Sequence, residues 1–226
     1  MELMSFLKQV PLFGGLTNEQ YDELAMIVTL QDYGRGQSIF AEGDPGTGFY
    51  VVMEGLVKIY KLSMEGKEQI LHIFGPGEPF AEAAVFTGST FPAHALALEK
   101  SRTIFIPRRA FIELIQTNPA LAMNMLAALS MRLKKFAHLI EDLSLKEVPG
   151  RVAAHLLFLS TQQGDSDTVK LNIGKAQLAS LLGTIPETLS RILTKLAKQG
   201  LISSEGAQIT ILDRDGLEDL AMGEKL

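Results

Sequence analysis

Hydrophobic and polar positions follow different patterns in successive parts of the chain. Thr17 with Gln20 three residues later has the spacing of a capping box, which predicts a helix in the N-terminal segment. Beyond Gly34, glycines separate short runs rich in β-branched and aromatic residues, with turn residues every ~8–12 positions. That pattern is typical of an antiparallel roll or jelly roll. The predicted strands include residues 38–40, 49–53, 56–60, 69–74 and 102–106.

A long helix is predicted after Asn118 and Pro119, which suit an N-cap and a first helical position. Apolar residues then recur at alternating spacings of four and three, which is the pattern of a coiled-coil seam. The alternative is one face of a helix packed on its own domain. The strict spacing favours a partner helix, most simply that of a second copy of the chain. The seam positions are Ala122, Leu126, Leu129, Leu133, Phe136, Ile140 and Leu143.

The C-terminal third has the pattern of a winged helix-turn-helix. Val148-Pro149-Gly150 is predicted to break the long helix and to mark a domain boundary. A short helix over 175–182, a turn containing Gly183 and an amphipathic helix over 186–199 match the helix-turn-helix pattern. A tight β-hairpin over 201–212 then adds the wing.

Composition narrows the class of protein. The chain has 226 residues, of which 46% are hydrophobic and 21% charged, as in globular domains. There is no cysteine, which excludes disulfides, iron–sulfur clusters, thiolate zinc sites and cysteine nucleophiles. No apolar run is long enough to span a membrane, and the first residues lack the basic segment of a signal peptide. We therefore expect a cytoplasmic protein with no membrane partner.

The net charge of -5 conceals a local basic stretch. Between Lys170 and Lys198, five cations face the single acid Glu187, a local excess of +4. A basic stripe on a helix-turn-helix is the electrostatic pattern of a protein that binds double-stranded DNA. The cations are Lys170, Lys175, Arg191, Lys195 and Lys198.

Four motifs carry a family resemblance over essentially the whole chain: EGD at 42–44, MEGLVKIY at 53–60, GEPFAE at 77–82 and PETLSRIL at 186–193. In this order they resemble the Crp/Fnr superfamily of bacterial transcription regulators. The resemblance implies an α+β fold with three parts. These are an antiparallel β-roll like a cyclic-nucleotide-binding domain over 1–117, a dimerisation helix over 118–147 and a winged helix-turn-helix over 148–226.

The motifs FAEA at 80–83 and DLSLK at 142–146 are most similar to the DNR and HcpR branch of the superfamily, which responds to nitric oxide. That resemblance implies a homodimeric activator of nitrogen-oxide or nitrosative-stress genes, with RNA polymerase as a partner. It also implies haem b as the nitric oxide sensor, and any haem is non-covalent because no CxxCH motif exists.

The second helix of the helix-turn-helix offers base-reading side chains. Glu187, Ser190 and Arg191 are spaced to share one helix face. Arginine can bind guanine O6 and N7 together, and glutamate can accept from cytosine N4. Alternatives are a capping box of Glu187 with Thr184 and a merely solvated face. The resemblance implies TTGA-type half-sites in an inverted repeat. The expected DNA-binding residues are Lys175, Thr184, Glu187, Thr188, Ser190, Arg191 and Lys195.

The effector is less well defined. In the cyclic-nucleotide-binding family an Arg-Ser pair holds the phosphate, but the corresponding residues 89–95 contain no arginine, so cyclic AMP is not expected. The haem implied by the branch needs an axial ligand, for which the candidates are the four histidines and the methionines. His72 or His94 leads by location only, ahead of His138 and His155. The expected effector or haem pocket comprises His72, Phe80, Glu82, Phe86, His94, Leu126 and Leu129.

Two other classes of protein are alternatives to a DNA-binding regulator. A jelly-roll metalloenzyme of the cupin type needs clustered ligands such as His-x-His, and the four histidines are scattered. A sensor whose C-terminal unit binds only a protein partner would show no salt-dependent binding to DNA. No arrangement of catalytic residues is recognisable, so we expect no enzymatic activity.

Overall fold

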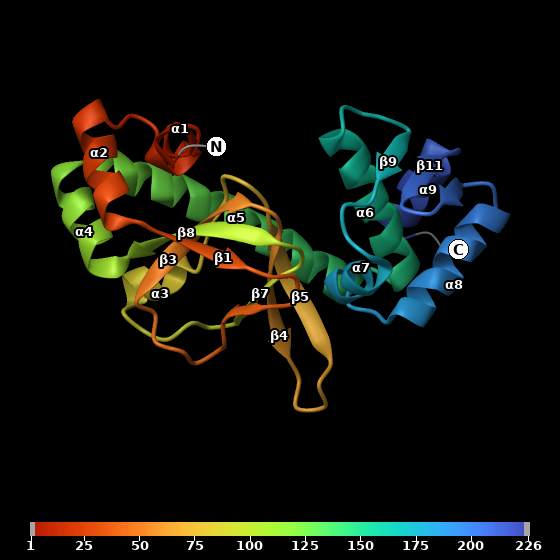
Figure 1. Cartoon of the computed structure of the whole chain (residues 1–226). Coiled ribbons are helices and arrows are strands. Elements are labelled where there is room, and N and C mark those ends of the chain that lie inside the picture. The colour runs from red at the N-terminus through yellow and green to blue at the C-terminus, as the bar shows by residue number, and fades with distance from the viewer. Residues whose placement is uncertain (1–2, 224–226) are drawn as a thin grey trace. The chain divides into compact units, whose positions relative to one another are not determined.

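The computed structural model describes residues 3–223 and consists of two compact units (Figure 1). The first comprises Met1–Lys134 and the second Lys135–Leu226. Each unit has a hydrophobic core of its own. The division falls inside one long helix, α5 (Pro119–Leu145). No helix among the described residues is long and apolar enough to cross a membrane.

The first unit contains the predicted β-roll. Two four-stranded antiparallel sheets have the strand orders β1-β8-β3-β6 and β2-β7-β4-β5. All five predicted strands are present, whereas β1, β6 and β7 were not predicted. The strands are β1 (Thr29–Tyr33), β2 (Ser38–Phe40), β3 (Gly48–Glu54), β4 (Val57–Leu62), β5 (Glu68–Phe74), β6 (Pro79–Phe80), β7 (His94–Ala97) and β8 (Ser101–Pro107).

Strand β3 is buried on both of its faces, because it lies between two layers of side chains. Phe49 and Val51 belong to the cluster of buried side chains that this sheet shares with the helices, which we call the helix-side core. Their neighbours there on β8 are Ile106 and Ile104. Tyr50, on the opposite face, belongs to a second cluster of buried side chains, which also contains Phe40 and Phe80 and which we call the roll interior. Alternation along one strand therefore supplies both cores.

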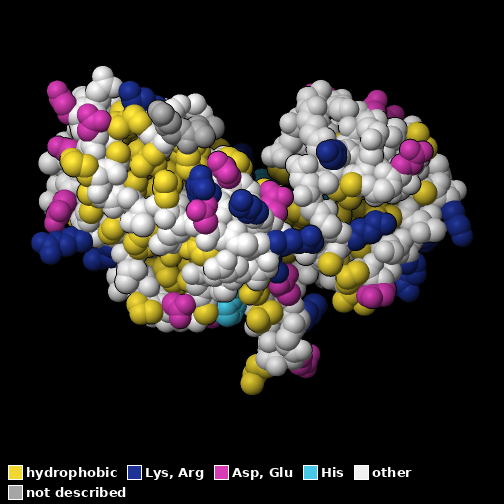
Figure 2. All heavy atoms as spheres, viewed as in Figure 1, with side chains coloured by type: hydrophobic (Ala, Val, Ile, Leu, Met, Phe, Trp, Pro, Cys, Tyr) yellow, Lys and Arg dark blue, Asp and Glu magenta, His cyan; other side chains and the backbone are white. Residues whose placement is uncertain are grey.

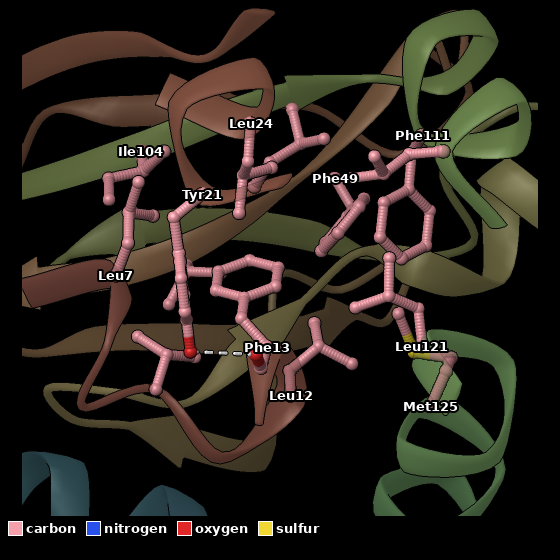
Figure 3. Close-up of a cluster of buried hydrophobic side chains, with 14 of the residues drawn as sticks. Leu7, Leu12, Phe13, Tyr21, Leu24, Phe49, Ile104, Phe111, Leu121 and Met125 are labelled. Carbon is pink, nitrogen blue, oxygen red and sulfur yellow. Dashed lines mark hydrogen bonds between the residues drawn. The ribbon is translucent and has the colours of Figure 1, made fainter. Parts of the chain in front are cut away.

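Helices cover the outer face of the sheet that contains β3 and form the helix-side core (Figure 3). The ring of Phe49 meets Phe111 edge to face at 4.7 Å between centroids. The Tyr21 hydroxyl donates to the Phe13 carbonyl at 2.9 Å. The predicted capping box is confirmed at the start of α2. The helical elements of this unit are α1 (Leu3–Leu7), η1 (Pro11–Phe13), α2 (Asn18–Ile27), α3 (Glu82–Thr87), α4 (Arg108–Thr117) and the first part of α5.

Aromatic rings fill the roll interior. Phe40 stacks on Phe91 at 3.9 Å between centroids and on Tyr50 at 5.7 Å. Phe80 lies 5.1 Å from Tyr50 and 5.7 Å from Phe74. These side chains come from four strands and one loop, so they join the two sheets into one packed layer.

Helix α5 begins as the sequence predicts, since the Asn118 side chain accepts from the Ala120 N–H at 3.1 Å and Pro119 follows it. It ends at Leu145, before the residues expected to break it. Val148 and Pro149 instead form the first turn of α6 (Val148–Gln162). Proline suits that turn because its missing N–H would have no helical partner there.

The second unit is the predicted winged helix-turn-helix. Strands β9, β10 and β11 form an antiparallel sheet in the order β10-β11-β9. Gly183 has φ +67° in the turn between the two short helices, a conformation that glycine adopts without strain. Besides α6, the elements are β9 (Thr168–Lys170), α7 (Lys175–Leu181), α8 (Pro186–Lys198), β10 (Ile202–Glu205), β11 (Gln208–Ile211) and α9 (Arg214–Met222).

Candidate nucleic-acid interface and effector site

Helix α8 presents one polar face. Glu187, Ser190 and Arg191 are exposed together near its N-terminal end, as their spacing predicts. The opposite face is anchored in the core of the second unit, which fixes the direction of the polar face. The anchoring residues are Leu189, Ile192, Leu193 and Leu196.

The first turn of α8 leaves Glu187 available for another partner. The N-cap is Ile185, and no side chain caps this end, so the alternative capping box of Thr184 with Glu187 is absent. Among the described residues, the Glu187 carboxylate has neither a hydrogen bond nor an ion pair. Arg191 Nη2 lies 3.4 Å from Thr188 Oγ1, a weak contact within the same face.

The polar face of α8 also carries Lys and Arg side chains. Figure 2 shows Lys and Arg side chains gathered where Figure 1 places α8. Arg191 and Lys195 also line a groove of about 570 Å³ with Pro149 and Arg151 at the start of α6. Lys195 lies in the last turn of α8, where a positive charge also suits the helix dipole.

Two other expected DNA-binding residues lie in α7 and the turn. Lys175 is the exposed first residue of α7. Thr184 is half-buried in the turn, and its N–H donates to the Ala179 carbonyl at 2.9 Å. The expected DNA-binding residues thus include a cation on α7, the first helix of the helix-turn-helix, as well as those on α8.

The heptad positions of α5 leave an apolar strip uncovered. Leu126, Leu133 and Ile140 have exposed fractions of 56, 70 and 65%. The intervening positions Ala122, Leu129, Phe136 and Leu143 are half-buried, and Leu129 packs against the helix-side core.

A buried ion pair joins α5 to the roll. Arg132 Nη1 donates to Glu82 Oε1, and Arg132 Nη2 donates to the Pro79 carbonyl at 2.6 Å. The guanidinium lies 4.7 Å from the centre of the Phe74 ring. Burial lowers the pKa of Arg132 to about 10, and the Glu78 carboxylate opposes that shift.

Glu82 Oε2, the other oxygen of this carboxylate, is buried and has no hydrogen-bond partner in the part of the chain that the structure describes. Glu82 is the first residue of α3, after Ala81 in the left-handed conformation at φ 66°. The Glu82 side chain is only 4% exposed, so water does not reach this oxygen freely.

Arg132 was not among the residues selected from the sequence. The sequence gives only a weak indication that Arg132 is paired with a distant residue. Arg132 interrupts a largely apolar stretch of α5, and none of the residues three or four positions away from it is acidic. A cation without a partner on its own helix needs one elsewhere if it is buried. The identity of that partner, 50 residues earlier in the chain, is not visible in the sequence pattern.

Three of the expected effector-pocket residues lie around Phe74. The rings of His72 and Phe80 are 4.5 and 5.7 Å from the Phe74 ring, and Glu82 pairs with the Arg132 guanidinium that lies over it. Phe80 belongs to the roll interior, Glu82 pairs with Arg132, and Leu129 lies on the helix-side core. Phe86 and Leu126 are largely exposed.

The two candidate histidines each lie against a carboxylate. His94 Nδ1 accepts the Glu42 N–H at 3.1 Å, and its Nε2 is 3.8 Å from Glu42 Oε2. His72 Nε2 is 4.0 Å from Glu78 Oε1, and its ring meets Phe74 edge to face at 4.5 Å.

Comparison with known proteins identifies the family. One family model, "Cyclic nucleotide-binding domain", matches residues 30–118, and another, "Crp-like helix-turn-helix domain", matches residues 150–220. The "CRP-like cAMP-activated global transcriptional regulator" of Mycobacterium tuberculosis is 31% identical over 215 residues, covering 93% of this chain and 96% of that relative. The chain belongs to the Crp/Fnr family of transcription regulators.

The chain is also similar to a second relative and to a solved structure. The "Fumarate and nitrate reduction regulatory protein" of Escherichia coli is 30% identical over 211 residues, covering 91% of this chain and 84% of that relative. The structure of FixK2 from Bradyrhizobium japonicum shares the fold with a TM-score of 0.75, at 24% identity over 88% of this chain and 99% of that one. Crp/Fnr regulators bind DNA and act as dimers, and they are not enzymes.

The resemblance to the DNR and HcpR branch implies haem, which makes a specific demand on the candidate histidines. An axial histidine must present a nitrogen lone pair to the iron. In His94 that lone pair on Nδ1 already accepts the Glu42 N–H, and Nε2 faces a carboxylate. The roll interior is filled by stacked rings. Haem ligation by His94 would therefore require this side chain to release the Glu42 N–H.

Proposed function

We propose that this Crp/Fnr regulator binds, as a homodimer, an inverted repeat of TTGA-type half-sites. The observation that supports the proposal is the common exposed face of Glu187, Ser190 and Arg191 on α8. Their donors and acceptors suit guanine and cytosine edges in the major groove. The exposed strip of Leu126, Leu133 and Ile140 supplies the apolar surface of a dimer helix.

The test is fluorescence anisotropy of a labelled duplex at fixed salt. One duplex carries two TTGA-type half-sites in an inverted repeat, about 10 base pairs between their centres. The control duplex has the same composition in scrambled order. We expect the repeat to bind at least about 1,000-fold more tightly than the control. Equal binding to the two duplexes would contradict the assigned half-site.

We further propose that a small effector other than a cyclic nucleotide controls DNA binding. Residues 89–95 offer no arginine for a phosphate, and two cations of this unit are paired with carboxylates, Lys61 with Glu42 and Arg132 with Glu82. A relative named for activation by cyclic AMP makes this the first alternative to test. We expect 1 mM cyclic AMP to leave both the anisotropy titration and the melting temperature unchanged. A saturable shift in either would overturn this proposal.

Nitric oxide acting through haem b, with control of nitrosative-stress genes, is the finer proposal for the signal. It is supported by the motifs at 80–83 and 142–146, which resemble the nitric-oxide-responsive branch. The test is an absorbance titration of the protein with ferrous haem, followed by DNA anisotropy with and without nitric oxide. Stoichiometric haem binding and tight DNA binding only with nitric oxide would support it. A protein that takes up no haem would exclude it and leave the regulator intact.

A further inference from the structure

The groove of about 570 Å³ between the first turn of α6 and helix α8 has the size of a ligand pocket, and all of its walls belong to the second unit. Pockets for small molecules measure ~300–1,000 Å³, so this groove can hold more than a single ion. Apolar and cationic side chains line it together. The apolar ones are those of Val148, Pro149 and Ile192, and the cationic ones are those of Arg151, Arg191 and Lys195.

The charges of the groove favour an anion. One carboxylate of the lining, that of Glu147, stands against the three cations, and it is exposed to solvent. Within the described residues, neither Arg151 nor Arg191 forms an ion pair. The groove also meets the N-terminus of α6, a helix of 15 residues whose N-cap side chain makes no capping hydrogen bond. The positive end of this helix dipole adds to the attraction for an anion.

Arg151 lacks acceptors for its guanidinium group. Its Nη1 lies 3.4 Å from the Leu143 carbonyl oxygen, which is a long contact. Its Nε is buried and has no hydrogen-bond partner in the part of the chain that the structure describes. Burial also lowers the pKa of Arg151, and Asp142 opposes that shift. Buried donors are nearly always paired in folded proteins, so an anion beside this guanidinium would supply acceptors that the chain does not.

We propose that this groove is a ligand site separate from the roll, and that it binds a small anionic compound with an apolar body. Arg151 and Arg191 hold the anionic group, and the apolar body lies on Pro149 and Ile192. The proposed function assigns the Arg191 guanidinium to DNA, so an occupant of the groove competes with the duplex. The competition therefore rests on the proposed function, whereas binding of the anion does not.

Four probes test the charge and the apolar body separately on the full chain: phenyl phosphate, inorganic phosphate, benzyl alcohol and benzylamine. Each is titrated into ¹⁵N-labelled protein without DNA at constant ionic strength, and the dissociation constant is taken from the amide shifts of residues 147–151 and 188–195. We expect phenyl phosphate to bind at least about tenfold more tightly than each of the others, because only it combines charge-assisted hydrogen bonds with an apolar ring.

Two results of this titration would overturn the proposal. Equal binding of inorganic phosphate would show a site for any phosphate, including those of the DNA backbone. The absence of a saturable shift in these residues with phenyl phosphate up to about 20 mM would show that no small anion of this class binds in the groove at a meaningful affinity.

Variants of the lining give effects of opposite sign. Arg151→Gln removes a cation and should weaken phenyl phosphate binding at least about tenfold. Glu147→Gln removes the opposing carboxylate and should strengthen it about two- to fivefold, as expected for an exposed charge. Arg109→Gln is the matched control, because its side chain is 93% exposed on α4 in the first unit, and it keeps the parental affinity. Parental affinity in Arg151→Gln would contradict the proposal. If that variant does not fold, parental affinity in Glu147→Gln contradicts it instead.

DNA anisotropy at matched ionic strength tests the competition and separates this inference from the proposed function. With phenyl phosphate at about ten times its dissociation constant, competition raises the apparent Kd for the TTGA-type repeat about 11-fold, and benzyl alcohol leaves it unchanged. A saturated groove with undiminished DNA binding would refute the competition. Preference for the repeat in a protein that binds no probe would refute the groove alone. Probe binding without that preference would refute the half-site and leave the ligand site standing.

Discussion

Arg191 and Lys195 lie one turn apart on α8 and are both exposed, yet their side chains suit different parts of a duplex. The planar guanidinium of Arg191 can make two parallel hydrogen bonds to one guanine. The Lys195 ammonium is a point charge on a flexible chain, which suits a phosphate of any sequence. Residue type thus separates base recognition from general attraction to the backbone.

Arg191→Ala is expected to weaken binding to the cognate repeat by about 1–3 kcal/mol and to relax the preference at one base pair. The measurement is anisotropy against duplexes with each base substituted at that position. Lys195→Ala is the matched control, because it removes a cation from the same face. It should weaken all duplexes alike and reduce the slope of log K against log salt by about 0.9. An Arg191→Ala protein with the parental ratio of cognate to scrambled binding would disprove the base-reading role.

His155 makes the second unit sensitive to acid. Burial on α6 lowers its pKa to about 4, partly opposed by Asp142. An unfolded histidine titrates near 6.5, so the unfolded state binds more protons between about pH 6.5 and 4. The free energy of unfolding is therefore expected to fall by up to about 3 kcal/mol as the pH is lowered through that window.

Urea unfolding between pH 7 and 4 measures this dependence. His155→Phe should remove most of it, whereas His138→Phe should leave it unchanged because His138 is exposed on α5. A His155→Phe protein that loses stability with acid as steeply as the parent would show that other groups control the acid sensitivity.

At the level of elements, helix α5 presents two apolar surfaces, one buried in its own unit and one exposed. Leu121 and Met125 are fully buried in the helix-side core, while Leu126, Leu133 and Ile140 are uncovered. A helix with one face buried in its own unit and an apolar strip outside it suits a partner helix. The heptad spacing predicted that strip, and family members act as dimers.

Leu133→Glu is expected to dissociate the dimer, because it places a charge in the apolar seam. Sedimentation equilibrium measures the association, and anisotropy measures the accompanying loss of binding to the inverted repeat. Met131→Glu is the matched control, since Met131 is 67% exposed on the same helix but lies off the seam. A dimeric Leu133→Glu protein would exclude this strip as the interface.

At the level of the whole molecule, the two units have separate hydrophobic cores and so divide the stability of the chain. Phe49 is fully buried in the helix-side core, and Leu189 is fully buried in the core of the second unit. The clusters share no residue, so a cavity in one unit removes no contact from the other.

Phe49→Ala is expected to destabilise the first unit by about 3–5 kcal/mol, and Leu189→Ala the second by about 2–5 kcal/mol. Differential scanning calorimetry should show each change in a different part of the unfolding profile. Equal displacement of the whole profile by either substitution would mean that the chain unfolds as one cooperative block.

The sequence by itself determined the elements whose pattern is local. Periodicity reports which side of an element is buried, so features defined by spacing over a short stretch of chain could be predicted. These features are the heptad seam of α5, the helix-turn-helix, the wing, and the exposed face of Glu187, Ser190 and Arg191. The same reasoning located most strands of the roll. It missed β1, β6 and β7, whose places in the sheets are defined by the strands they pair with.

Only the tertiary structure decided the contacts between distant segments. Glu82 meets Arg132 across 50 residues, and the Glu42 amide occupies His94 across 52. Such pairs depend on strand register and on how α5 lies on the roll, which no local pattern encodes. That is why the sequence could name His94 as a ligand candidate but could not show that its lone pair was already used, nor that Glu82 keeps one oxygen free.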